Sequence, residues 1–133
     1  MAAFKSGYSG TIDAYLELAA VPQMNTPREK NAVCEKFGQA NEELKNAIGN
    51  FTSAKASSTA SSEHGFTIGM VLERAGPIQL NAEDAQISCM KAVLADREGD
   101  SGAFEKNLAA TGENIREMKR IYPELEVLNS DFS

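Results

Sequence analysis

The sequence predicts an all-α protein, a small bundle of four to five helices that includes one unusually long heptad-patterned helix. Apolar residues return every three or four positions in several separate stretches, which is the spacing of one face of a helix. Capping residues, glycines and prolines mark the ends of these stretches. One stretch alternates like a strand, but it has no second strand to pair with, and an isolated strand is unstable.

Length and composition agree with one globular domain. The chain has 133 residues, of which 42% are hydrophobic and 24% are charged, so wholesale disorder is not expected. A chain of this length buries about two thirds of its surface on folding. We therefore expect a single helical domain over residues 1–133.

The first element is a short helix that follows an irregular N-terminal arm. Glycine and serine punctuate residues 1–10, and Phe4 and Tyr8 within this arm need an apolar surface to lie on. Thr11 is the expected N-cap of the helix, and Pro22 ends it. The apolar stripe of this helix consists of Ile12, Tyr15, Leu16 and Ala19.

The long helix carries the strongest pattern in the chain. Thr26 is a helix cap, Pro27 occupies the first helical position, and Glu29 lies three residues after the cap. A helix over 27–55 would be about 43 Å long, at about 1.5 Å per residue. This length exceeds what a compact domain of this size needs, so the helix either breaks or projects towards a partner. Its apolar residues follow a 4-3-4-3-4-3 spacing at Val33, Phe37, Ala40, Leu44, Ala47, Phe51 and Ala54.

The middle of the chain is less regular. Residues 52–64 are rich in serine and alanine and are predicted to be a loop. Residues 64–74 have both strand and helix periodicity, and we interpret them as a short helix that ends at Gly76 and Pro77.

The next helix is apolar around a wide arc. Asn81 is its expected cap, and Ile87, Met90 and Leu94 form its large apolar stripe. Such a helix is packed on more than one side, so it is either central in the bundle or faces another subunit. Small residues occupy its neighbouring faces at Ala82, Ala85, Cys89, Ala92 and Val93.

The last helix is predicted to begin after Gly99 and to stop at Pro123. Asp100 or Ser101 caps it. Residues 123–133 then form an acidic and apolar tail. The apolar seam of the helix repeats with 4-3-4-3-4 spacing at Phe104, Leu108, Thr111, Ile115, Met118 and Tyr122.

The charge distribution excludes several classes of partner. The net charge is −6, and residues 82–133 carry six basic and eleven acidic side chains. A nucleic-acid backbone requires concentrated positive charge, and the chain has only one adjacent basic pair, Lys119 and Arg120. No apolar run is long enough to span a bilayer, and the N-terminus lacks the apolar core of a secretory signal. We therefore expect no nucleic acid, no transmembrane segment, and an intracellular location, either cytoplasmic or organellar after processing.

Two cysteines are too few for a disulfide framework. Cys34 and Cys89 are separated by a spacing that fits no zinc motif. We interpret both as small packing residues, because free cysteine commonly behaves as a small hydrophobe. The alternatives are a single long-range disulfide between the two cysteines and a covalent ligand on Cys89 or on Cys34.

The sequence contains no recognisable catalytic or metal-binding arrangement. His64, the single histidine, lies beside Glu63, which is the wrong spacing for a metal pair on a helix. Nucleotide-binding glycine loops are absent. Adjacent acidic residues such as Glu42 and Glu43 point about 100° apart on a helix and cannot act on one bond. We therefore expect a non-catalytic protein without a metal ion or cofactor.

Exposed apolar segments then favour a structural or adaptor subunit that acts by protein–protein contact in a homo- or hetero-oligomer. The alternative is a carrier of an apolar small molecule or thiol-linked pigment between helices, because helical bundles can bind such ligands. The candidate interface residues are Phe4, Tyr8, Phe51, Leu125, Leu128 and Phe132.

Overall fold

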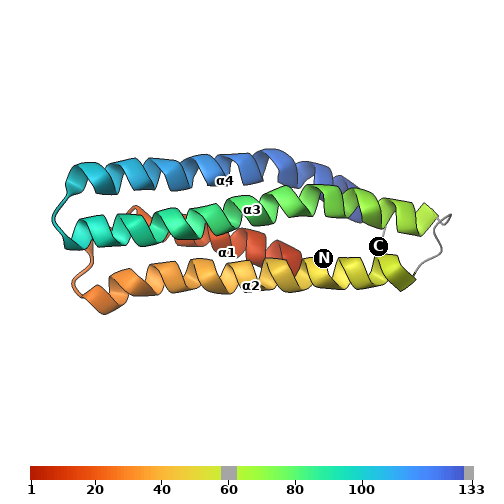
Figure 1. Ribbon diagram of the computed structural model, residues 1–133, viewed down its shortest axis with the longest axis horizontal. Coiled ribbons are helices and arrows are strands. Elements are labelled where there is room, and N and C mark those ends of the chain that lie inside the picture. Colours follow the sequence, from red (N-terminus) through yellow and green to blue (C-terminus); the bar gives the residue numbers. More distant parts are fainter. Residues whose placement is uncertain (58–62, 131–133) are drawn as a thin grey trace.

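The computed structural model describes residues 1–57 and 63–130 and confirms the all-α fold class (Figure 1). Within these residues there are four α-helices, one short 3₁₀ turn over Val21–Gln23, and no strand. The helices are α1 (Ala2–Leu18), α2 (Pro27–Ser57), α3 (Glu63–Arg97) and α4 (Ser101–Ser130).

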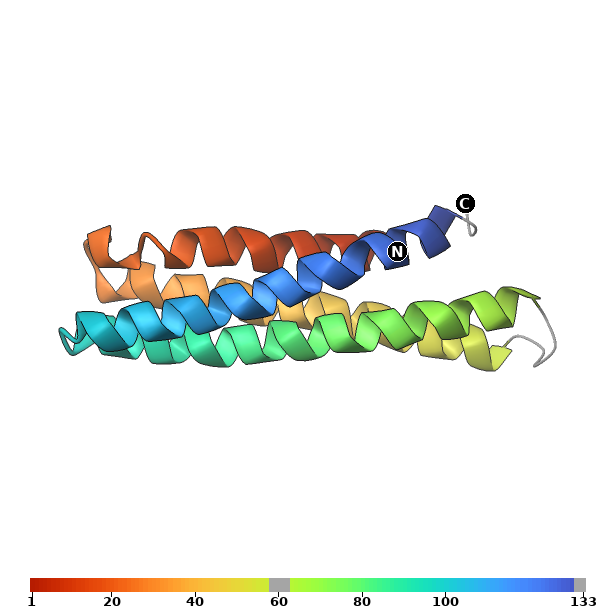
Figure 2. The ribbon, with the colours of Figure 1, turned by 90° about the horizontal axis from the view of Figure 1, so that it is seen from above.

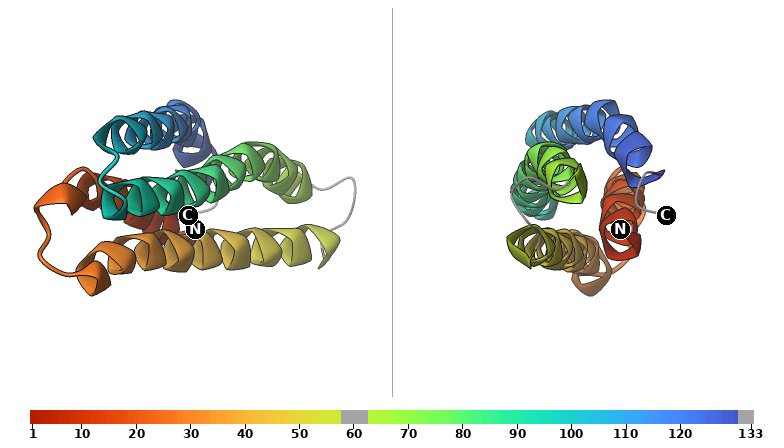
Figure 3. Two further views of the ribbon diagram at one scale, coloured as in Figure 1. Left: turned by 60° about the vertical axis from the view of Figure 1, so that its left-hand side comes forward. Right: turned by 90° about the vertical axis from the view of Figure 1, so that its right-hand side faces the viewer.

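The helices form an antiparallel bundle in which each helix lies beside its neighbours in the chain. Seen end-on in the right panel of Figure 3, α1, α2, α3 and α4 follow one another around a common axis. Figure 2 shows that the C-terminal half of α4 crosses over the N-terminal end of α1. Because α1 has 17 residues and α3 has 35, the far end of the α2–α3 pair extends beyond α1.

The N-terminus of α2 has the predicted cap. The backbone N–H of Glu29 donates to Oγ1 of Thr26 at 3.1 Å, and Oε2 of Glu29 accepts from the backbone N–H of Asn25 at 3.1 Å. The heptad seam is buried from Val33 to Ala47. The helix reaches Ser57 and α3 begins at Glu63, so the predicted loop over 52–64 is wrong for residues 52–57 and 63–64, while 58–62 lie outside the described residues.

The expected irregular arm at residues 1–10 is wrong, because α1 begins at Ala2. The predicted stripe is right for Ile12 and Tyr15, which are half-buried against the core, and wrong for Leu16, which is 64% exposed. Thr11 is fully buried inside the helix rather than capping it. Oγ1 of Thr11 donates to the carbonyl of Gly7 at 2.9 Å, which satisfies the buried hydroxyl. The buried face has 3-4-3-4 spacing and consists of Phe4, Gly7, Thr11, Ala14 and Leu18.

Helix α3 does not end at Gly76 and Pro77, in contrast to the prediction (Figure 1). A proline inside a helix costs about 3 kcal/mol in local terms. The ring of Pro77 is exposed, while Ala75 and Ile78 on either side are fully buried. Burial of these neighbours keeps the helix continuous, and Asn81 is an interior residue whose Nδ2 donates to the carbonyl of Pro77 at 2.9 Å.

Helix α4 begins as predicted and ends later than predicted. Gly99 has a φ of 76°, and Oδ1 of Asp100 accepts from the backbone N–H of Ala103 at 3.0 Å. The helix continues through the exposed Pro123, because Leu125 is fully buried two residues later. The predicted tail is therefore helical up to Ser130, and 131–133 lie outside the described residues.

Two apolar clusters make up the core. One contains Phe4, Leu44, Ala47, Val71, Ala75, Ile78, Ala82, Ile115, Met118, Ile121, Tyr122 and Leu125. The other contains Ala14, Leu18, Val21, Val33, Phe37, Ala85, Cys89, Ala92, Val93, Ala95 and Phe104. Buried polar residues fall between the two sets along their helices, at Thr11, Asn41 and Thr111.

Helix α1 approaches α2 so closely that a glycine is required at one position. A Cβ atom at Gly7 would lie 2.8 Å from the carbonyl oxygen of Ala40 and 3.0 Å from the backbone N of Leu44. Backbone atoms cannot yield as a flexible side chain can, so a larger residue would push the two helices apart.

We predict that Gly7→Ala lowers the free energy of unfolding by about 1–3 kcal/mol, as expected for overpacking. Gly49→Ala is the matched control, since Gly49 lies in α2 and a Cβ added there would point into open space. It should raise stability by about 0.5–1 kcal/mol through helix propensity. Urea unfolding followed by circular dichroism measures both values, and equal effects of the two substitutions would contradict the close approach.

Stacked tyrosines join α1 to α4. The rings of Tyr8 and Tyr122 have centroids 3.8 Å apart and planes 6° apart. Burial raises the pKa of both phenols above the usual value of 10.0, and the charge of Glu126 raises it further. For Tyr122, ionised Tyr8 is an additional cause of the raised pKa.

These raised pKa values predict a loss of stability in alkali. Below about pH 10 both phenols are protonated in the folded and unfolded states, so their contribution is fully present. Above that pH the unfolded chain loses these protons first, and the free energy of unfolding falls as pH rises towards the folded pKa values. Urea unfolding between about pH 9 and 11 should show a steeper decline for the unmodified chain than for Tyr8→Phe/Tyr122→Phe. If the free energy of unfolding declined equally with pH in both proteins, the loss of stability could not be assigned to Tyr8 and Tyr122.

Candidate functional site

Helix α3 has an inner face of small residues. This face lies against α2 on one side and α4 on the other (Figure 3). Small side chains allow neighbouring helices to approach closely, because interaxial distance depends on the residues at the contact. The fully buried residues on this face include Ala75, Ala82, Ala85, Cys89 and Ala92.

Four large apolar residues of the same helix face outward. We call them the α3 stripe: Leu80 is 62% exposed, Ile87 51%, Met90 58% and Leu94 51%. Leu80, Ile87 and Leu94 are one heptad apart and lie on one line along about 21 Å of helix. The stripe exposes roughly 400 Å² of apolar surface, which is within the range of the largest apolar patches on monomeric proteins, and such patches are often functional.

Charged residues border the stripe with opposite signs at its two ends. Glu83 and Asp84 are exposed one turn before Ile87, whereas Lys91 is exposed one turn after it. Oε1 of Glu83 accepts a hydrogen bond from Nε2 of Gln79 at 3.2 Å. The stripe is therefore an apolar line with an acidic N-terminal half and a basic residue in its C-terminal half.

An open groove of about 480 Å³ between α2 and α3 adjoins the stripe. Met90 and Leu94 belong both to the stripe and to the groove wall. The groove is lined by Asn31, Cys34, Glu35, Gln86, Met90, Val93, Leu94 and Arg97.

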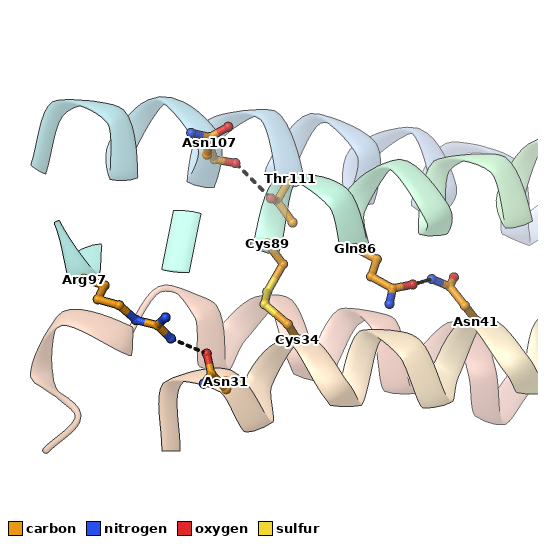
Figure 4. The surroundings of a disulfide bond; sticks show 8 residues. All are labelled: Asn31, Cys34, Asn41, Gln86, Cys89, Arg97, Asn107 and Thr111. Carbon is orange, nitrogen blue, oxygen red and sulfur yellow. Dashed lines mark hydrogen bonds between the residues drawn. A yellow bond between two sulfur atoms is a disulfide. The ribbon is translucent and has the colours of Figure 1, made fainter. Parts of the chain in front are cut away.

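A disulfide between Cys34 and Cys89 joins α2 to α3 beside this groove (Figure 4). The Cα atoms are 5.8 Å apart, which is a normal separation for a bonded pair. The interpretation of the cysteines as free packing residues is thus replaced by the disulfide alternative. While bonded, neither sulfur is available to a thiol-linked ligand, and such a ligand stays a prediction for the reduced protein. Disulfides persist in oxidising compartments, so the expected intracellular location stays untested as well.

Polar pairs hold α2 and α3 in one register on both sides of the disulfide. Nδ2 of Asn41 donates to Oε1 of Gln86 at 2.6 Å, and Nη2 of Arg97 donates to Oδ1 of Asn31 at 2.9 Å (Figure 4). A partly buried ion pair at the end of the helices links Lys30 to Asp96 at 2.6 Å. Together these contacts keep α3 from sliding along α2.

None of the interface residues predicted from the sequence belongs to the α3 stripe. Phe4 and Leu125 are fully buried core residues and contribute no exposed surface. Tyr8, Phe51 and Leu128 are half-buried against the first apolar cluster, so a partner contact stays a prediction for them. Phe132 lies outside the described residues, as does the side chain of His64.

Sequence reasoning identified Ile87, Met90 and Leu94 as an apolar stripe but did not include them among the interface candidates. Leu80 was missed because α3 was expected to begin near Asn81. The available signal was the heptad spacing of Leu80, Ile87 and Leu94 on a helix whose other faces carry small residues.

Comparison with known proteins provides no family for this chain. No protein-family model, no curated protein and no solved structure matches it. Within residues 1–57 and 63–130, no helix is both long enough and apolar enough to span a membrane. The same part of the chain contains no group of three His, Cys, Asp or Glu side chains that could hold a metal ion.

The disulfide predicts a large effect of reduction on stability. The bond closes a loop with a sequence separation of 55 residues. Loop-closure entropy for such a loop corresponds to about 4 kcal/mol. We expect a reducing agent to lower the free energy of unfolding by about 2–5 kcal/mol in urea titrations. Cys34→Ala/Cys89→Ala should show a similar loss and no further response to the reducing agent, and a response of that variant would contradict the assignment.

Proposed function

We propose that this protein is a non-catalytic structural or adaptor subunit that acts by protein–protein contact through the α3 stripe. The observation that carries the proposal is the outward position of four large apolar side chains of one helix, each more than half exposed. Exposure of apolar surface to water is unfavourable by about 25 cal/mol per Å², so a partner that covers the stripe stabilises the complex.

The composition of the stripe's border favours a protein partner over a lipid surface. Interfaces between proteins commonly have an apolar centre with a charged rim, as Glu83, Asp84 and Lys91 provide here. An anionic membrane surface attracts clusters of basic residues, whereas this chain has a net charge of −6.

Rigidity of α3 further supports a contact role. The disulfide and the Lys30–Asp96 pair fasten the helix to α2 at two separate positions. A surface that is already ordered loses little conformational entropy when it binds, so more of the interaction energy remains as affinity.

The groove beside the stripe provides weaker support for the alternative function, the carriage of an apolar ligand. It is open to solvent and is lined in part by the charged residues Glu35 and Arg97. Apolar ligands are usually held in enclosed, mainly apolar cavities. Both sulfurs are bonded to each other, so a covalent anchor would require reduction first.

We predict that the contact is lost when the stripe is charged. The full-length chain, its Ile87→Lys/Leu94→Lys variant and a Leu16→Lys control are used to capture proteins from extract of the native source. Leu16 is 64% exposed on α1, so the control places a lysine at an apolar position that is at least as exposed as Ile87 and Leu94. Proteins retained by the unmodified chain and by the control should be lost with the stripe variant, while circular dichroism confirms equal folding. Identical sets of retained proteins for all three chains would refute the proposal.

A further inference from the structure

We propose that the partner covering the α3 stripe is a second copy of this chain, bound with the two α3 helices antiparallel about a two-fold axis at Ile87. The inference rests on the proposed function, because it names the partner of the same surface. Three properties of the stripe support it: its symmetry about Ile87, the order of its charges, and its area.

Three of the four apolar residues of the stripe are arranged symmetrically about Ile87, and the fourth, Met90, lies opposite the partner's Asp84. Leu80 lies seven residues before it and Leu94 seven residues after it, and both are more than half exposed. A two-fold axis through Ile87 that reverses the helix direction places Leu80 opposite the partner's Leu94. It also places Ile87 opposite the partner's Ile87. A self-complementary patch of this kind is what a two-fold dimer requires.

The charges favour the antiparallel orientation. Glu83 and Asp84 precede Ile87 by one turn, and Lys91 follows it by one turn. Reversing one helix brings these acidic residues close to the partner's Lys91, and the same pairing occurs twice by symmetry. A parallel pairing would bring acidic residues to acidic residues and lysine to lysine, which costs energy. An antiparallel pairing in another register, with the axis between Glu83 and Asp84, would place Glu83 opposite the partner's Asp84, which is also unfavourable.

The area is appropriate for a dimer of moderate affinity. The stripe supplies roughly 400 Å² per copy, about half of the ~800 Å² that each partner buries in a standard interface. The charged border and the outer edge of the α2–α3 groove, which shares Met90 and Leu94 with the stripe, supply additional surface. We therefore expect dissociation in the micromolar range, with monomer and dimer in measurable equilibrium.

The primary test is sedimentation equilibrium of the purified full-length chain over a wide micromolar range. The weight-average mass should rise with concentration from 14.3 kDa towards twice that value. Ile87→Lys should remain monomeric, because it places two lysines together on the axis, whereas the Leu16→Lys control should dimerise like the unmodified chain. A monomeric unmodified chain, or a dimer that survives Ile87→Lys, would overturn the proposal.

Charge reversal tests the orientation. Lys91→Glu alone and Glu83→Lys/Asp84→Lys alone should each raise the dissociation constant by about fivefold, since two exposed ion pairs are lost. The combined triple variant restores opposite charges across the axis and should return the dissociation constant to near that of the unmodified chain. Failure of this rescue would exclude the antiparallel pairing, because in a parallel dimer the changes would not compensate one another.

Cross-linking provides an independent measurement of the same orientation. A mixture of Leu80→Cys and Leu94→Cys chains should form a covalent dimer with a short bismaleimide, and each variant alone should form much less. The native cysteines are bonded to each other and do not react with the reagent. Equal cross-linking of Leu80→Cys with itself would show a parallel arrangement and overturn the proposal.

The outcomes also separate this inference from the function on which it rests. If the chain is monomeric but retains a different protein that Ile87→Lys/Leu94→Lys loses, the second-copy proposal fails and the contact function stands. If the chain neither dimerises nor retains any protein through the α3 stripe, both fail.

Discussion

The bundle depends on how closely α3 can approach the helices on both of its sides. Between Ala82 and Ala92 its buried residues are alanines and Cys89, and the helix packs against α2 and α4 at the same time. Large side chains there would hold the neighbours apart, because protein interiors are closely packed. In this segment Ile87 and Met90 are on the opposite face, so the packing that stabilises the monomer also exposes part of the surface that we propose as its contact site.

Periodicity in the sequence was sufficient to predict the bundle and the seams of α2 and α4. The spacing of apolar residues along one helix shows which of its faces forms a seam, without knowledge of the neighbouring helices. The ends of helices were less predictable. Pro77 and Pro123 are local breakers, yet buried neighbours such as Ile78 and Leu125 keep both helices continuous. Gly7 contributed to the wrong prediction of an irregular N-terminal arm. In the structure this glycine permits a close contact between α1 and α2, which the sequence alone does not reveal.

The candidate site was only partly accessible to sequence reasoning. Ile87, Met90 and Leu94 could be recognised as one apolar face, but whether that face points inward depends on which other face of α3 meets α2 and α4. The pairing of Cys34 with Cys89 likewise depends on the register between two helices, which is fixed by contacts such as that between Asn41 and Gln86. Such contacts join residues far apart in the chain, and spacing rules do not describe them.

The disulfide has a consequence for the continuity of the polypeptide. It joins α2 to α3 across the connection that contains residues 58–62, so a protease that cut this connection would leave two fragments held by one covalent bond. Such a nicked protein would run as a single species on a denaturing gel without reductant and as two species with it. Because the disulfide keeps the two halves covalently joined, the connection between α2 and α3 does not have to do so. This connection is therefore a suitable place for an inserted sequence or for new chain ends.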